Sequence, residues 1–86
     1  MWYVYILESK SKKNWIYIGF TNNLKRRFSE HTEGKSLSTK AYSPLYLKAY
    51  IAVKTEEKAR ELEKYLKKGS GKAFLKKRIL TDEALA

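Results

Sequence analysis

Residues 15–24 read WIYIGFTNNL, and this stretch predicts a β-strand that leads directly into an α-helix. Its first six residues are aromatic or branched apart from one glycine, a composition typical of strands. Because side chains alternate along a strand, Tyr17 and Gly19 are expected on the same face. The polar residues 21–23 supply hydroxyl and amide groups that cap helices, so a helix is expected over residues 24–34.

The start of the chain predicts the strand that pairs with this one. Residues 2–7 read WYVYIL and contain only aromatic, branched and aliphatic side chains, which is typical of a central strand covered on both faces. A short polar connection separates them from residues 15–20 and indicates a hairpin. If odd-numbered residues pair with odd-numbered residues, Tyr3 and Tyr5 share the face of Tyr17.

The second half of the chain predicts one further strand and two helices. Residues 35–43 form a polar, basic loop, and every second residue over 45–53 is aliphatic, which predicts a third strand. Thr55 caps a helix that runs to about Lys68, and residues 69–71 (Gly-Ser-Gly) are expected to break it before a short third helix. The order ββαβαα predicts an α/β fold, with a three-stranded antiparallel sheet packed against helices.

The length and the absence of cysteine limit the class of protein. The 86 residues are expected to form a single domain over residues 1–86, with residues 81–86 as a frayed tail. No cysteine is present, which excludes disulfides and cysteine-ligated zinc and fits a reducing cytoplasm. The apolar start stops at Glu8, too soon for a signal peptide or a membrane span. We therefore expect a cytoplasmic protein with no membrane partner.

The charge predicts a polyanionic partner. Nineteen Lys and Arg residues face nine Asp and Glu residues, for a net charge of +10. Residues 21–54 carry seven basic and two acidic side chains, net +5, whereas residues 55–68 carry only net +1. Such a one-sided excess favours nucleic acid as the partner. The alternative is that the charge serves solubility alone.

Three ionisable residues are candidates for a site, and each has an ordinary explanation as well. Glu63 falls at the margin of the apolar stripe of the second helix, where its carboxylate either binds a divalent cation or pairs with Lys67 one turn later. Arg27 is placed to bind a phosphate with two donors, or it lies on a solvated helix face. His31, one turn after Arg27, is a catalyst or a histidine favoured by the helix C-terminus.

Taken together, these residues resemble the GIY-YIG nuclease superfamily. Residues 3–5 (Tyr-Val-Tyr) stand where the first motif of that family falls, and residues 17–19 (Tyr-Ile-Gly) match the second. Arg27, His31 and Glu63 follow in the order and spacing of the family. The resemblance covers almost the whole chain and is greatest to the small stand-alone bacterial members. These are related to the N-terminal nuclease domain of the excision-repair incision subunit, which implies a role in DNA repair.

The resemblance implies a role for each matched residue. Tyr17 would be the general base that activates water, and Tyr5 would orient the nucleophile or the phosphate. Arg27 would stabilise the negative charge of the phosphorane, and His31 would assist Tyr17 or the leaving group. An ordinary phenol has a pKa of about 10, so its phenolate at pH 7 costs roughly 4 kcal/mol. Nearby positive charge would lower that cost.

The metal and the DNA complete the implied site. Glu63 would hold a single Mg²⁺ or Mn²⁺ on the scissile phosphate, and Gly19 would leave room for the nucleic-acid backbone. The resemblance thus implies a divalent-metal-dependent DNA endonuclease, a phosphodiester hydrolase, with RNA as a second substrate class. Most characterised relatives carry a separate DNA-binding domain. None is evident here, so a targeting protein partner is part of the expectation.

The chain departs from the family in its first motif and after its second. The first motif reads Tyr-Val-Tyr rather than Gly-Ile-Tyr, and Phe20 stands where some relatives have a lysine. Activation of the base would therefore depend on His31 or on the metal.

The basic region suggests which side chains contact phosphates. Four of them are expected to do so without reading sequence: Lys25, Arg26, Lys35 and Lys40. Two other function classes remain open, a non-catalytic nucleic-acid-binding module on the same scaffold and a protein-interaction domain. Glu63 favours an enzyme over the binding module, because a protein that only binds nucleic acid has no need of a carboxylate that faces a polyanion.

Overall fold

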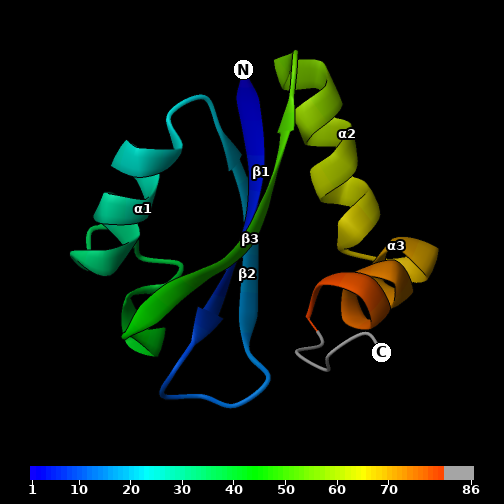
Figure 1. The fold of residues 1–86 in the computed structure, drawn as a ribbon. Helices are drawn as coiled ribbons and strands as arrows, with labels where there is room; N and C mark the ends of the chain where they lie inside the picture. Colours follow the sequence, from blue (N-terminus) through cyan, green and yellow to red (C-terminus); the bar gives the residue numbers. More distant parts are fainter. Residues whose placement is uncertain (81–86) are drawn as a thin grey trace, which may run out of the picture.

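The computed structural model describes residues 1–80, and its centre is a three-stranded antiparallel sheet in the order β2-β1-β3 (Figure 1). The strands are β1 (Trp2–Ser9), β2 (Ile16–Thr21) and β3 (Leu45–Val53). β1 is central, as its wholly apolar sequence predicts, and odd residues pair with odd ones: Tyr5 lies opposite Gly19 and Leu7 opposite Tyr17. The predicted fold class and hairpin register are confirmed.

Helix α1 (Leu24–Thr32) follows β2 through the predicted cap. The side chain of Asn23 accepts a hydrogen bond from the backbone N–H of Arg26, which satisfies one of the free donors at the helix start. Gly34 follows the last turn with a φ of 76°, the left-handed conformation that ends many helices. Gly34 is thus the residue directly after the C-cap, as expected, and the helix itself ends at Thr32.

Helices α2 (Glu56–Leu66) and α3 (Gly69–Phe74) occupy the C-terminal part, and a wider helical turn, η2 (Leu75–Ile79), extends α3. The Thr55 hydroxyl caps α2 as predicted, by accepting from the N–H of Lys58. The expected break at residues 69–71 is wrong in one respect, because α3 begins at Gly69 itself. Gly69 has a φ of 60°, the left-handed conformation that glycine favours, and Gly71 lets α3 pack closely against α2, because a Cβ there would clash with the backbone of Tyr65. The predicted frayed tail, residues 81–86, lies outside the described residues.

The sheet separates two layers of helices, with α1 on one face and α2 and α3 on the other (Figure 1). On the α2 face, the buried cluster joins Val4, Ile6 and Ile18 to residues of α2 and η2. On the α1 face, the cluster is built around Tyr5 and Leu7 and includes partly buried residues of α1. A polar phenol thus belongs to the second core, which is the first structural sign of a site there.

Strand β3 changes face part-way along its length. Ile6 pairs with Ala49 but Leu7 pairs with Leu47, so the register shifts at a bulge. Leu47 consequently joins the α1 cluster, whereas Ala49 joins the α2 cluster. A single apolar face along β3, which the sequence alternation suggests, is therefore wrong, because the bulge residue Lys48 interrupts the pleat.

Over residues 1–80, no helix is long and apolar enough to cross a membrane.

Candidate active site

Tyr5 and Gly19 lie opposite each other on β1 and β2 and fit together closely. A Cβ atom on Gly19 would lie 2.5 Å from the Tyr5 hydroxyl and 2.7 Å from Cζ. The glycine therefore admits the phenol of Tyr5 across the strand pair. Close approach of a nucleic-acid backbone to Gly19 stays a prediction.

His31 connects Tyr5 to the loop that follows α1. Its Nε2 lies 3.0 Å from the Tyr5 hydroxyl, and its Nδ1 lies 2.7 Å from Oγ1 of Thr39. Both His31 and Thr39 are fully buried, and Tyr5 is 2% exposed. One strand, one helix and one loop thus meet in a single buried chain of three polar groups.

The electrostatics of this chain indicate where its protons lie. Burial, as the largest cause, raises the pKa of Tyr5 to about 12, so its phenol is neutral near pH 7. Burial, followed by the positive charge of Arg27, lowers the pKa of His31, so the imidazole is neutral too. A neutral Tyr5 can donate to Nε2 of His31, and the Nδ1–H can then donate to Thr39. In this arrangement the oxygen of Tyr5 stays an acceptor, facing Arg27.

Tyr17 lies on β2, at the edge of the sheet, and is only half-buried. Its ring centroid is 6.1 Å from that of Tyr5 and 5.1 Å from that of His31. Of the two motif tyrosines, Tyr17 is thus the one that solvent and a substrate can reach. The sequence predicts this convergence of Tyr5, Tyr17 and His31, and the structure brings the three together.

Arg27 is held beside the site by a neighbouring carboxylate on α1. Its Nη1 lies 2.9 Å from Oε1 of Glu30, and about a third of its side chain is exposed. The hydrogen bond that Arg27 donates to Glu30 is the main cause that raises the pKa of Arg27 and lowers the pKa of Glu30. The nearby hydroxyl of Tyr5 raises the pKa of Arg27 further. The guanidinium is therefore charged, adjacent to Tyr5, and partly open to solvent.

Glu63 lies on α2 with only 18% of its side chain exposed, and its carboxylate is 3.5 Å from Nζ of Lys67. The ion pair of the ordinary explanation is therefore present. The negative charge of Glu63 also raises the pKa of Tyr5, as the smallest of the causes, so the two groups are close enough to interact.

The donor set around Glu63 fits one kind of metal site. Residues 1–80 contain no group of three His, Cys, Asp or Glu side chains that could enclose an ion. Mg²⁺ does not require such an enclosure, because it is often held by one or two carboxylates together with substrate phosphates and water. A single half-buried carboxylate fits an ion that arrives with a phosphate.

The basic side chains expected to contact phosphates lie on α1 and on the loop after it, and all are exposed: Lys25, Arg26, Lys35 and Lys40. Arg26 is 3.9 Å from Glu30, and Lys35 is 3.0 Å from Glu33. Surface ion pairs of this kind contribute little to stability. These basic side chains can therefore leave their carboxylate partners and bind a phosphate.

Thr39 is the site residue that the sequence analysis misses. It falls in a stretch of serines, lysines and a threonine that is typical of a solvated loop, and no local signal marks it as buried. It lies beside His31 because the loop folds back over α1 through a 3-10 turn, η1 (Lys40–Tyr42). The hydroxyl fixes the imidazole by hydrogen bonding to Nδ1.

Burial of a neutral His31 makes stability depend on pH. In the unfolded chain its pKa is about 6.5, and in the folded chain it is lower. The unfolded state therefore binds the proton first as the pH falls. The free energy of unfolding should be constant above about pH 6.5 and fall below it, by at most about 1.4 kcal/mol per pH unit.

Urea unfolding between pH 7.5 and pH 5 measures this effect, and His31→Gln provides the comparison because the chain has one histidine. We expect the free energy of unfolding of the variant to depend less on pH over this range than that of the parent. An equally steep decline in both proteins would show that another group is responsible.

Comparisons with known proteins identify a family for this chain. Residues 1–78 match the family described as the GIY-YIG catalytic domain. The chain is similar to UPF0213 proteins of Vibrio campbellii (33% identity over 67 residues, 77% of this chain) and Bacillus licheniformis (34% over 71 residues, 81% of this chain and 71% of the relative). It spans 62% of the length of the Vibrio relative.

A solved structure is similar as well. The solution NMR structure of a UPF0213 protein from Bacillus halodurans is 36% identical, with a TM-score of 0.47 over 78% of this chain and 71% of that one.

Proposed function

Because the chain belongs to the GIY-YIG family, whose members are generally endonucleases, we propose that it hydrolyses phosphodiester bonds in DNA with the help of a divalent metal ion. One observation supports this more than any other. The partly exposed Tyr17 lies beside a buried, hydrogen-bonded pair, Tyr5 and His31, and next to a charged Arg27. A fixed phenol, an accessible phenol and a guanidinium suit the attack of water on a phosphate.

The two tyrosines are proposed to have different roles. Tyr17 is half-buried and, as the phenolate, would take the proton from the attacking water and become the neutral phenol. Tyr5 is neutral and donates its proton to His31, so its oxygen would orient the attacking water by accepting a hydrogen bond from it. His31 has both ring nitrogens occupied within the protein, so it acts through Tyr5 as a positioning residue. Thr39 holds the tautomer of His31 that accepts from Tyr5.

Arg27 and Glu63 are proposed to stabilise the negative charge of the phosphate, Arg27 directly and Glu63 through a metal ion. Arg27 donates to the phosphate oxygens as negative charge develops there, and it shares its guanidinium with Glu30 until substrate binds. Glu63 would hold Mg²⁺ or Mn²⁺, which polarises the phosphoryl oxygen when bound. We place this activity in the cytoplasm and, by the resemblance, in DNA repair.

A non-catalytic nucleic-acid-binding module is the second candidate, because the same basic surface would serve it. Incubation with labelled single strands, duplexes, flaps and RNA, each with Mg²⁺, Mn²⁺ or EDTA, separates the two. We expect cleavage of at least one DNA substrate with metal and none with EDTA. Binding without cleavage of any substrate in either metal would favour the module.

Binding to duplex DNA is expected to fall steeply with salt. If the four basic side chains of α1 and its following loop each neutralise one phosphate, log Kd should change with log salt by a slope of about 3.6. Affinity would then fall roughly 100-fold between 50 and 200 mM salt.

Fluorescence anisotropy in EDTA measures this, and Lys40→Gln should lower the slope by about 0.9. Lys58→Gln on α2, an exposed lysine away from this surface, is the matched control and should leave the slope unchanged. An affinity independent of salt would remove the electrostatic argument.

A further inference from the structure

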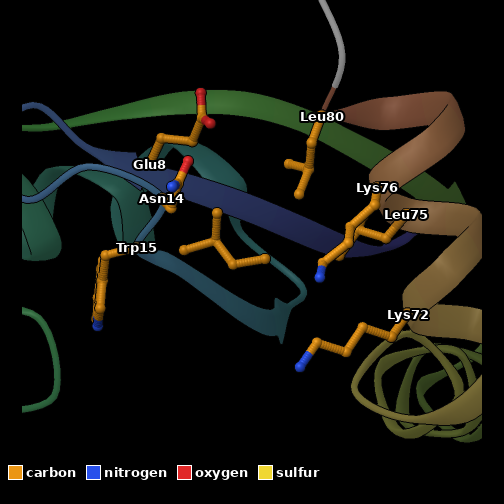
Figure 2. A pocket seen from close by; sticks show the side chains of 8 residues that line it. Glu8, Asn14, Trp15, Lys72, Leu75, Lys76 and Leu80 are labelled. Atoms are coloured by element: carbon orange, nitrogen blue, oxygen red, sulfur yellow. The ribbon is translucent and has the colours of Figure 1, made fainter.

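A cavity of about 670 Å³ lies between the β1–β2 hairpin and the helical segment formed by α3 and η2 (Figure 2). We call it the α3 groove. Its lining residues are Glu8, Asn14, Trp15, Ile16, Lys72, Leu75, Lys76 and Leu80. No residue that the resemblance assigns to the active site is among them, so the groove needs an explanation of its own.

Two lysines give the α3 groove its charge. Lys72 and Lys76 are one helical turn apart, and Figure 2 shows both amines extending into the cavity toward the strands. Neither has an acidic partner within residues 1–80. Glu8, on the opposite wall, accepts from the Tyr46 hydroxyl and lies 3.8 Å from Nζ of Lys48, so its charge is already compensated from β3. Two cations that face one cavity and have no acidic partner in the described part of the chain favour an anionic occupant.

The α3 groove continues toward the candidate active site. A smaller hollow of about 210 Å³ shares Ile16, Lys72 and Leu75 with it and reaches Lys67. The amine of Lys67 is 3.5 Å from the carboxylate of Glu63. A continuous basic track therefore follows the edge strand β2 and ends beside the one carboxylate proposed to hold metal.

The lining identifies the occupant more closely. Apolar side chains make up half of the lining, and Trp15 provides an aromatic ring, one face of which stacks on Tyr42 at 4.0 Å. Lysines together with an aromatic side chain are the combination that binds unpaired nucleic-acid strands, with phosphates on the cations and bases on apolar surface. The volume lies in the range of small-ligand sites, about 300–1,000 Å³, which admits a nucleotide or two but not a duplex.

We propose that the α3 groove binds an unpaired DNA strand and leads it toward Glu63. The DNA substrate would then carry a single-stranded segment beside the cleaved bond. The direction of the strand toward the scissile phosphate rests on the proposed function, whereas binding in the groove does not.

Binding in EDTA tests the groove without cleavage. The probe is a labelled oligothymidylate of about eight nucleotides. The test protein is Lys72→Gln/Lys76→Gln, and the matched control is Lys64→Gln/Lys77→Gln, two exposed lysines outside the lining with the same loss of charge. The groove variant should lower the slope of log affinity against log salt by about 1.4, and the control should leave it nearly unchanged.

A second readout locates the strand. Trp2→Phe leaves Trp15 as the single tryptophan, so oligothymidylate should change its fluorescence. Thermal melting of each variant separates loss of binding from loss of fold.

The proposal would be overturned if both pairs of lysine substitutions weakened oligothymidylate binding equally, or if the fluorescence of Trp15 stayed unchanged at saturating oligothymidylate. Binding in the groove by a protein that cuts no substrate would support this inference and reject the proposed nuclease.

Discussion

Tyr17→Phe should lower the rate of DNA cleavage by about 10²–10⁴-fold, the usual contribution of a general base. The substitution removes only the hydroxyl, and the ring keeps its contacts with Tyr5 and His31. Because Tyr17 is only partly buried at the edge of the sheet, the fold and DNA affinity should be unchanged. Single-turnover cleavage with Mg²⁺ or Mn²⁺, beside anisotropy and thermal melting, measures all three.

Tyr3→Phe is the matched control for this prediction. Tyr3 lies on the same strand as Tyr5, two residues earlier, and packs edge-on against Tyr50 at 5.9 Å. We expect its variant to cut DNA at close to the parental rate. If Tyr17→Phe retains the same activity as the parent, Tyr17 is not the base.

Glu63→Gln should abolish metal-dependent cleavage and leave DNA binding equal or slightly stronger. The amide keeps the shape of the side chain but removes the charge that a divalent ion needs. It also removes a negative charge near the phosphates, which favours binding. Loss of the ion pair with Lys67 should cost only a few tenths of a kcal/mol of stability.

Two further measurements separate metal binding from the ion pair. Mn²⁺ added to the parent should first broaden the NMR signals of residues around Glu63, Tyr17 and His31. Glu57→Gln, an exposed acid on the same helix, is the control and should retain both the broadening and the cleavage. Broadening elsewhere, or cleavage by Glu63→Gln at the parental rate, would rule out Glu63 as the metal ligand.

Much of the fold could be predicted because its signals are local. The central position of β1 follows from a strand that is apolar on both faces, and the starts of α1 and α2 follow from Asn23 and Thr55. The wrong details have a common origin in tertiary contacts. The bulge in β3 and the start of α3 at Gly69 depend on packing between elements that no local pattern encodes.

The sequence by itself determined the order of the elements, the basic excess and the resemblance that puts Tyr5, Tyr17, Arg27 and His31 in one site. Only the tertiary structure decided that Tyr5 is a buried phenol with a raised pKa, fitted against Gly19. It also decided that Thr39 fixes His31 and that Lys72 and Lys76 share a cavity with Trp15. Periodicity and capping depend on neighbours within a few residues, whereas burial, pKa and cavity shape depend on groups that meet only after the chain has folded.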